Sequence, residues 1–264
     1  MVPVNCPPHF VLLRGLWREA RHWGEFPGHL QQRFPGALIS TSDIPGNGMR
    51  NHAISPDTVA GMTDALRQQI DLSRPVRLIA LSMGGMIAID WMTRYPAEIE
   101  AAVLINTSAR PLSPFYRRLR WTAYAHVLRL LFHSRAEREA DILRLTSNRH
   151  QHDKKLLDSW QQWQRQNPVS PISGKNQLLA AMKFTVTTKP QQPLLVVTSR
   201  ADRLVDYRCS RKLVQTWNAD YVEHESAGHD LPLDEPEWLI QAIGRWFDYP
   251  SSAKKGNSRY PWFP

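Results

Sequence analysis

The chain has 264 residues, 42% of them apolar, which suffices for a core built as one large domain or as a domain with an insertion. Its two cysteines, Cys6 and Cys209, form neither a disulfide framework nor a zinc-type spacing, so we expect free thiols and no metal site. No apolar stretch reaches the roughly 18 residues of a membrane span, and no lysine or arginine precedes Arg14 to start a signal peptide. A cytoplasmic protein is therefore expected. The formal net charge of +9 favours an anionic partner.

Strands and helices alternate in the first part of the chain. The apolar runs predict strands at 9–13, 37–42, 76–81 and 101–106, with helices at 57–70 and 85–95. The same alternation returns late in the chain, with strands at 194–197 and 221–223 and helices at 207–217 and 235–247. This order predicts the α/β class, with a mainly parallel sheet of about six strands flanked by helices.

The strand Val76–Leu81 ends at Ser82, and Gly84 and Gly85 follow before helical character begins. A sharp turn from strand to helix strains the residue at the turn, and neighbouring glycines let the two elements approach closely. Ser82 is therefore the candidate nucleophile. An ordinary turn in another α/β protein also produces such a pattern, so the rest of the chain must supply its partners.

Those partners follow the two late strands. A serine hydroxyl needs a histidine to take its proton and a carboxylate to hold that histidine. We assign the base to His229 and the carboxylate to Asp202. Asp206 is the rival acid, but it opens a predicted helix and is typical of an N-cap. Asp230, directly after His229, is expected to be solvated.

The frame Ala80-x-Ser82-x-Gly84 and the chain order Ser, Asp, His resemble the α/β-hydrolase family, with alanine in place of the first glycine of its nucleophile elbow. The resemblance covers roughly residues 10–247. It implies an α/β-hydrolase fold, a serine esterase with a helical cap, and no cofactor. The family often opens with an antiparallel hairpin, whereas only eight residues precede the first strand here, so a trimmed sheet is expected.

An oxyanion hole needs two backbone N–H groups. Met83, directly after the nucleophile, supplies one, and by resemblance Leu16 supplies the other, because it follows a glycine after the first strand. Arg14 stands where the family usually has histidine. It could brace the loop, clamp a substrate carboxylate or face solvent. Trp17 and Trp23 lie near this loop and are candidates for lining an apolar acyl pocket, although ordinary core positions would explain them too.

Residues 109–190 contain no run that predicts a parallel strand. Their apolar spacing is helical, with Leu119, Ala123, Val127 and Leu131 four apart, and this predicts a helical lid inserted into a core of residues 1–108 and 191–250. Residues 251–264 are expected to form a flexible tail. From 109 to 155 there are eleven basic residues and four acidic ones, an excess of seven.

A cationic lid would steer an anionic acyl ester or thioester, such as a coenzyme A or phosphopantetheine thioester or an acyl group on an acidic carrier protein. A solvated helix face is the alternative explanation of the same charges. No nucleic acid is expected, because no recognition motif accompanies them. The function expected from the sequence is cleavage of a carboxylic ester or thioester through an acyl-enzyme on Ser82. Carbon–carbon bond hydrolases, lactonases and perhydrolases use the same triad, and a non-catalytic binding module is the competing class.

Overall fold

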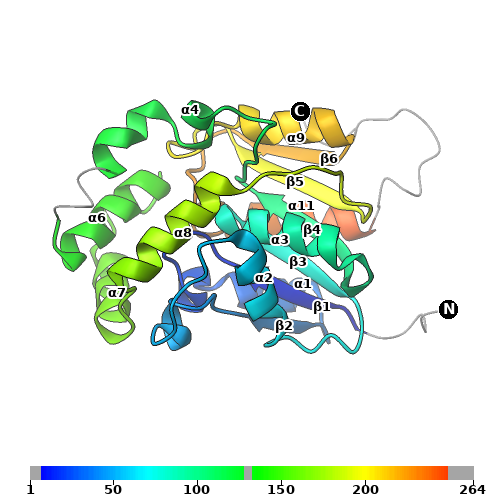
Figure 1. Cartoon of the computed structure of the whole chain (residues 1–264), viewed down its shortest axis with the longest axis horizontal. Coiled ribbons are helices and arrows are strands. Elements are labelled where there is room, and N and C mark those ends of the chain that lie inside the picture. The colour runs from blue at the N-terminus through cyan, green and yellow to red at the C-terminus, as the bar shows by residue number, and fades with distance from the viewer. Residues whose placement is uncertain (1–6, 128–132, 249–264) are drawn as a thin grey trace.

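The computed structural model describes residues 7–127 and 133–248. Six parallel strands form one sheet in the order β2-β1-β3-β4-β5-β6, with helices on both faces (Figure 1). The strands are β1 His9–Leu13, β2 Leu38–Thr41, β3 Val76–Leu81, β4 Ile99–Ile105, β5 Leu194–Ser199 and β6 Asp220–His224. The helices that flank them include α1 Phe26–Arg33, α2 Val59–Arg67, α3 Met83–Arg94, α9 Arg208–Trp217, α10 Leu231–Asp234 and α11 Pro236–Asp248. The predicted six-stranded parallel sheet is confirmed.

Successive side chains of each strand enter two different cores. In β1, Val11 and Leu13 join the core under α2, α3 and α9, while Phe10 and Leu12 join the core under α1 and α11. All four are buried, which explains why this strand is a continuous apolar run rather than an alternating one. The central strands are thus covered on both faces, whereas the edge strand β2 is exposed or half-buried throughout.

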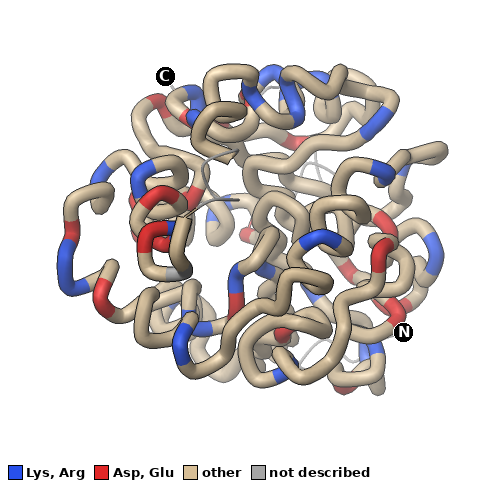
Figure 2. The backbone as a smooth tube through the Cα atoms, turned by 60° about the vertical axis from the view of Figure 1, so that its left-hand side comes forward, with Lys and Arg blue, Asp and Glu red and all other residues tan. Residues whose placement is uncertain are grey.

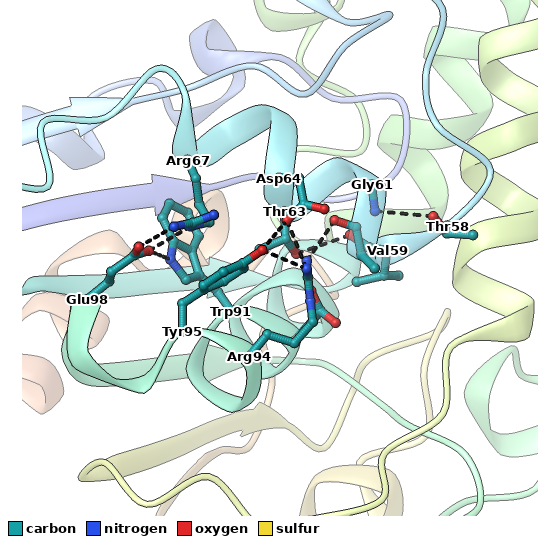
Figure 3. Close-up of polar contacts among 12 residues, drawn as sticks. Thr58, Val59, Gly61, Thr63, Asp64, Arg67, Trp91, Arg94, Tyr95 and Glu98 are labelled. Atoms are coloured by element: carbon teal, nitrogen blue, oxygen red, sulfur yellow. Dashed lines mark hydrogen bonds and ion pairs between the residues drawn. The ribbon is translucent and has the colours of Figure 1, made fainter.

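A polar network joins α2 to α3 on the outer surface (Figure 3). The Arg94 guanidinium donates to Asp64 at 2.9 Å and to Asp90 at 2.7 Å, and the Tyr95 hydroxyl donates to the same Asp64 oxygen at 2.9 Å. Arg67 pairs in the same way with Glu98. This network holds two helices together far from the carboxyl ends of the strands.

Residues 109–190 lie between β4 and β5, and their described part consists of helices joined by loops, with α4 Phe115–Arg118, α6 Arg135–Thr146, α7 Lys154–Gln166 and α8 Pro171–Lys183. We call this stretch the helical segment. Helices α6 to α8 gather at one end of the sheet, on the left of Figure 1. Its role as a lid and the domain boundaries at 109 and 190 stay predictions.

Buried polar contacts attach the helical segment to the sheet. Gln177 of α8 accepts from the Trp17 backbone N–H at 2.9 Å and donates to Asn47 at 2.6 Å. Glu139 of α6 accepts two bonds from Arg18, at 2.7 and 3.1 Å. Because these groups are buried, their hydrogen bonds fix where α6 and α8 sit.

The helical spacing of apolar residues over 116–131 predicted the structure of this stretch only in part. Leu119 is extended (φ −129°, ψ 116°), so α4 ends there instead of continuing toward Val127. The cause is tertiary pairing: the Arg120 N–H donates to the Leu204 carbonyl at 2.9 Å, and the Asp206 N–H donates to the Arg117 carbonyl at 2.9 Å. Leu131, like Cys6 and the predicted tail 251–264, lies outside the described residues.

One further difference concerns a helix. The helix α1 was not predicted, because a proline and a glycine in its first turn weaken the helical signal of its sequence. In the described part of the chain, no helix is both long enough and apolar enough to cross a bilayer.

Candidate active site

Ser82 occupies a strained turn between β3 and α3. Its backbone has φ 59° and ψ −118°, a conformation that non-glycine residues rarely adopt. The Ser82 N–H donates to the Ile105 carbonyl at 2.8 Å, and the Thr107 hydroxyl donates to the Ser82 carbonyl at 2.7 Å. These bonds to the end of β4 stabilise the turn.

The two glycines after Ser82 allow close packing at the turn. A Cβ at Gly85 would lie 2.7 Å from the Thr107 side chain, and one at Gly84 would overlap the Leu13 carbonyl of β1. Alanine is excluded from both positions for this reason. Gly15 packs on the other side, where an added Cβ would lie 3.0 Å from the Ser82 Cβ and 3.4 Å from its Oγ. The loop after β1 therefore lies directly against the Ser82 side chain.

His229 and Asp202 are in contact. The His229 Nδ1 and the Asp202 Oδ2 are 2.7 Å apart, and the two residues are 4% and 1% exposed. The other carboxylate oxygen, Oδ1, accepts from the backbone N–H groups of Leu204 at 2.7 Å and Val205 at 2.9 Å. The carboxylate is thus held by its own loop and presents one oxygen to the imidazole.

Asn106 connects the ends of three strands, and sequence reasoning missed this role. Its side chain donates to the His229 carbonyl at 2.8 Å and accepts from the Ser199 N–H at 2.9 Å. Its φ of 47° lies in the left-handed region, which asparagine tolerates better than most residues. The signal available in the sequence was an asparagine at the end of a buried strand. Through Asn106 and the adjacent Thr107, the end of β4 contacts both the serine turn and the histidine loop.

The rival acid Asp206 lies at the start of α9, one residue before the N-cap Tyr207 rather than at the N-cap itself. Its carboxylate accepts from the backbone N–H of Arg208 at 2.9 Å. The expectation for Asp230 was wrong: it is 2% exposed and binds Arg14.

Arg14 makes a bidentate ion pair with Asp230. Its two terminal nitrogens lie 3.0 and 2.5 Å from the two carboxylate oxygens, and its guanidinium stacks 5.0 Å from the centre of the Trp23 ring. The solvent-facing alternative for Arg14 was wrong, because the residue is 6% exposed. A substrate clamp would have to displace Asp230. The brace is the alternative that fits, with a carboxylate as its acceptor.

The remaining predicted residues lie close to this loop. Trp23 is 2% exposed and stacks on Phe26 in the core under α1, so it is placed as a core residue. Leu16 and Trp17 are half-buried, and Trp17 has a positive φ of 59°. Met83 is the first residue of α3, a position whose N–H has no acceptor one turn earlier in the helix.

Two buried titratable groups near the sheet have shifted pKa values. Burial lowers the pKa of His22 well below its usual value, and the charges of Arg18 and Arg14 lower it further. Burial raises the pKa of the Cys209 thiol to about 11, so this thiol stays protonated at neutral pH. No group of three or more His, Cys, Asp or Glu side chains in residues 7–127 and 133–248 is arranged to hold a metal ion.

The six-stranded parallel sheet with helices on both faces is the fold of an α/β hydrolase. Residues 48–236, well over half of the chain, match the family model Hydrolase_4, described as serine aminopeptidase, S33. The chain belongs to this family.

Relatives and solved structures agree with that class. The pimeloyl-[acyl-carrier protein] methyl ester esterase of Chromobacterium violaceum is 29% identical over 103 residues, 39% of this chain and 38% of that protein. A thermophilic esterase from Thermogutta terrifontis has a TM-score of 0.71 at 18% identity, covering 92% of this chain and 90% of the other. The 2-hydroxy-6-oxo-6-phenylhexa-2,4-dienoate hydrolase from Rhodococcus sp. strain RHA1 has a TM-score of 0.72 at 17% identity, covering 92% and 91%.

At these identities the structural likeness shows the fold alone. The chain spans well under two thirds of the curated relatives that it matches, 38% and 22% of their lengths.

Proposed function

We propose that the protein is a serine hydrolase that cleaves a carboxylic ester or thioester through an acyl-enzyme on Ser82. The observation that carries this proposal is the buried hydrogen bond between His229 and Asp202, at the same sheet edge as the strained Ser82 turn. A carboxylate, an imidazole and a hydroxyl on the ends of three strands are the groups that acyl transfer requires.

Each residue has one role in the reaction. The Ser82 Oγ attacks the acyl carbon while the His229 Nε2 takes the hydroxyl proton. Asp202 accepts a hydrogen bond from Nδ1–H, which fixes the tautomer and stabilises the imidazolium. His229 then gives the proton to the departing alcohol or thiol. A water molecule, deprotonated by the same imidazole, attacks the acyl-enzyme, and the acid leaves with Ser82 restored.

The oxyanion of each tetrahedral intermediate needs donors beside Ser82. The proposed donors are the N–H groups of Met83 and Leu16. The close packing of Gly15 on Ser82 supports Leu16, because it brings this loop within van der Waals contact of the nucleophile. The neighbouring N–H, that of Trp17, is already engaged by Gln177.

For the substrate class we propose an acyl ester or thioester whose leaving group is anionic or is borne on an acidic carrier protein. The basic excess of residues 109–155 supports this, as does the relative whose name specifies an acyl-carrier-protein ester.

Several of these basic side chains already bind other groups of the protein: Arg118 and Arg120 donate to backbone carbonyls, and Arg149 pairs with Glu235. Basic and acidic positions are spread over the whole molecule (Figure 2). Lys154 and Lys155, exposed at the start of α7, are the pair best suited to a steering test.

Labelling with a fluorophosphonate probe tests the chemistry. We expect the wild-type protein to gain one adduct, mapped by mass spectrometry to Ser82, and Ser82→Ala to gain none. Ser73→Ala, at an exposed serine, is the control and labels like wild type. A folded wild-type protein without an adduct would favour the non-catalytic binding module instead.

A substrate panel tests the bond that is cleaved. It should contain p-nitrophenyl esters of increasing chain length, a coenzyme A thioester, a lactone, an aminoacyl anilide and a carbon–carbon bond substrate. We expect the ester or thioester to have the largest kcat/KM. For the anionic thioester, kcat/KM should fall with added salt, and Lys154→Gln/Lys155→Gln should reduce it further than Lys212→Gln on α9 does.

A further inference from the structure

Arg14 and Asp230 join the loop after β1 to the loop that carries His229. We propose that this ion pair is a positioning device, which fixes the loop carrying Gly15 and Leu16 relative to the loop carrying His229. The inference rests on the proposed hydrolase function.

The ion pair links segments that are distant in sequence. Arg14 and Asp230 are 216 positions apart, and their side chains are each 4% exposed. Two parallel N–H···O bonds fix the orientation of the guanidinium relative to the carboxylate as well as their separation. Arg14 is two residues before the proposed oxyanion donor Leu16, and Asp230 directly follows His229, so each end of the pair lies within two residues of a group of the proposed site.

Arg14 is anchored independently at its backbone and at its side chain. A Cβ at Gly84 would lie 2.8 Å from the Arg14 carbonyl, so this carbonyl packs on the first turn of α3. The guanidinium lies over Trp23, which is itself buried against Phe26. Because both ends of Arg14 are fixed, the carboxylate that it binds is fixed relative to the serine turn.

Asp230 is anchored as firmly. Its N–H donates to the Thr146 carbonyl at 2.8 Å, and its own carbonyl accepts from the N–H groups of Leu233 and Asp234 at 3.0 Å each. Asp202 holds the His229 ring through its Nδ1. A shift of Asp230 therefore moves the imidazole relative to both Asp202 and Ser82.

The guanidinium does not supply charge to the reaction in this arrangement. Both of its terminal nitrogens are bound to Asp230, whose carboxylate neutralises it. The effect expected of the pair is thus geometric, acting on the rate of attack by Ser82 rather than on substrate binding.

The decisive variant is Arg14→Met/Asp230→Leu. Removing both partners leaves no unpaired buried charge, so the protein is expected to fold with a Tm close to wild type. We expect kcat for a p-nitrophenyl ester, and the rate constant for fluorophosphonate inactivation, to fall by about 10- to 100-fold while KM changes by less than about threefold. Arg77→Met/Glu100→Leu is the control, an equally bidentate but exposed pair near the amino ends of β3 and β4, and it should leave both rates unchanged.

Arg14→Lys is a second, independent test. It keeps the buried charges balanced but replaces the planar fork by a single donor group, and its rates should lie between those of wild type and the double variant. Wild-type rates in the double variant, an equal loss in the control pair, or a lysine variant as slow as the double variant would each overturn the inference. A wild-type protein that fails to label at Ser82 removes the hydrolase proposal and this inference with it, whereas a labelled wild type with unaffected variants removes the inference alone.

Discussion

Two groups of arginine–carboxylate pairs in this molecule use the same chemistry in different surroundings. On the α2–α3 surface, Arg94 and Asp64 are 31% and 46% exposed in their side chains (Figure 3). At the carboxyl edge of the sheet, the side chains of Arg18 and Glu139 are 8% and 4% exposed. The distances are similar, so burial is the difference that matters.

Burial changes what each pair can do. An exposed pair is solvated whether or not it forms, and it contributes only about 0 to 1 kcal/mol. A buried pair has lost its water, and removing one partner leaves a charge that costs about 3 to 5 kcal/mol. The exposed network therefore adds a little stability, whereas the buried pairs determine which loops lie next to each other at the proposed site.

The largest expected difference between the two regions concerns activity. Asp202→Asn removes the carboxylate that holds His229, and kcat should fall by about 10⁴-fold. The same chemical change at the surface, Asp64→Asn, should leave kcat within about twofold, because that region touches none of the proposed groups. Steady-state kinetics with an ester substrate measures both. An Asp202→Asn enzyme that retains a tenth of its kcat would contradict the assigned role.

The next difference concerns stability. Arg18→Met leaves the Glu139 carboxylate buried without its partner, and the free energy of unfolding should fall by about 3 to 5 kcal/mol. Arg94→Met should lower it by about 1 kcal/mol or less, because water replaces the lost contacts. Urea denaturation gives both values. Equal losses in the two variants would mean that burial is not what separates the regions.

Comparing the sequence with the structure shows which features of the molecule could be predicted from the sequence. Strands β1 and β3 were predicted to the residue, because an apolar run that ends at glycine or at a polar residue is a local signal. The contact between Asp202 and His229 was predicted because parallel strands bring their carboxyl ends to one edge. The strained turn at Ser82 was predicted in the same way, from the end of its strand and the glycines after it.

What could not be predicted depends on partners that are distant in the chain. Nothing near Asp230 indicates that Arg14 will bury it, so a residue next to the histidine was expected to be solvated. Similarly, the helical spacing around Leu119 gives no sign that the neighbouring backbone pairs with the loop of residues 202–206. Such contacts exist only once the sheet has brought the loops together, and they override the local pattern.

The dependence of the free energy of unfolding on pH should also differ between the buried region and the α2–α3 surface. Burial and the charges of Arg18 and Arg14 lower the pKa of His22, so the folded state holds this imidazole neutral where the unfolded state protonates it. Below the unfolded value of about 6.5, the unfolded state binds the extra proton, and the free energy of unfolding falls as pH falls, by at most about 1.4 kcal/mol per pH unit. The loss ends below the lowered folded pKa.

His22→Asn should make this dependence shallower, since asparagine keeps an acceptor but does not titrate. The check is urea denaturation from pH 7.5 to 5.0, with Arg94→Met as the surface control, which should follow the wild-type slope. Parallel curves for wild type and His22→Asn would show that His22 does not contribute.

The smallest expected difference is the response of each pair to salt. A double-mutant cycle on Arg94 and Asp64 should give a coupling free energy of about 0.5 kcal/mol at 0.1 M NaCl that approaches zero at 1 M, because the Debye length shortens from about 10 to 3 Å. The cycle on Arg18 and Glu139 should give a larger value that salt changes little, since mobile ions cannot enter between buried groups. A buried coupling that falls with salt as steeply as the surface one would mean that water and ions reach the α6 contact, and that α6 opens from the sheet edge in solution.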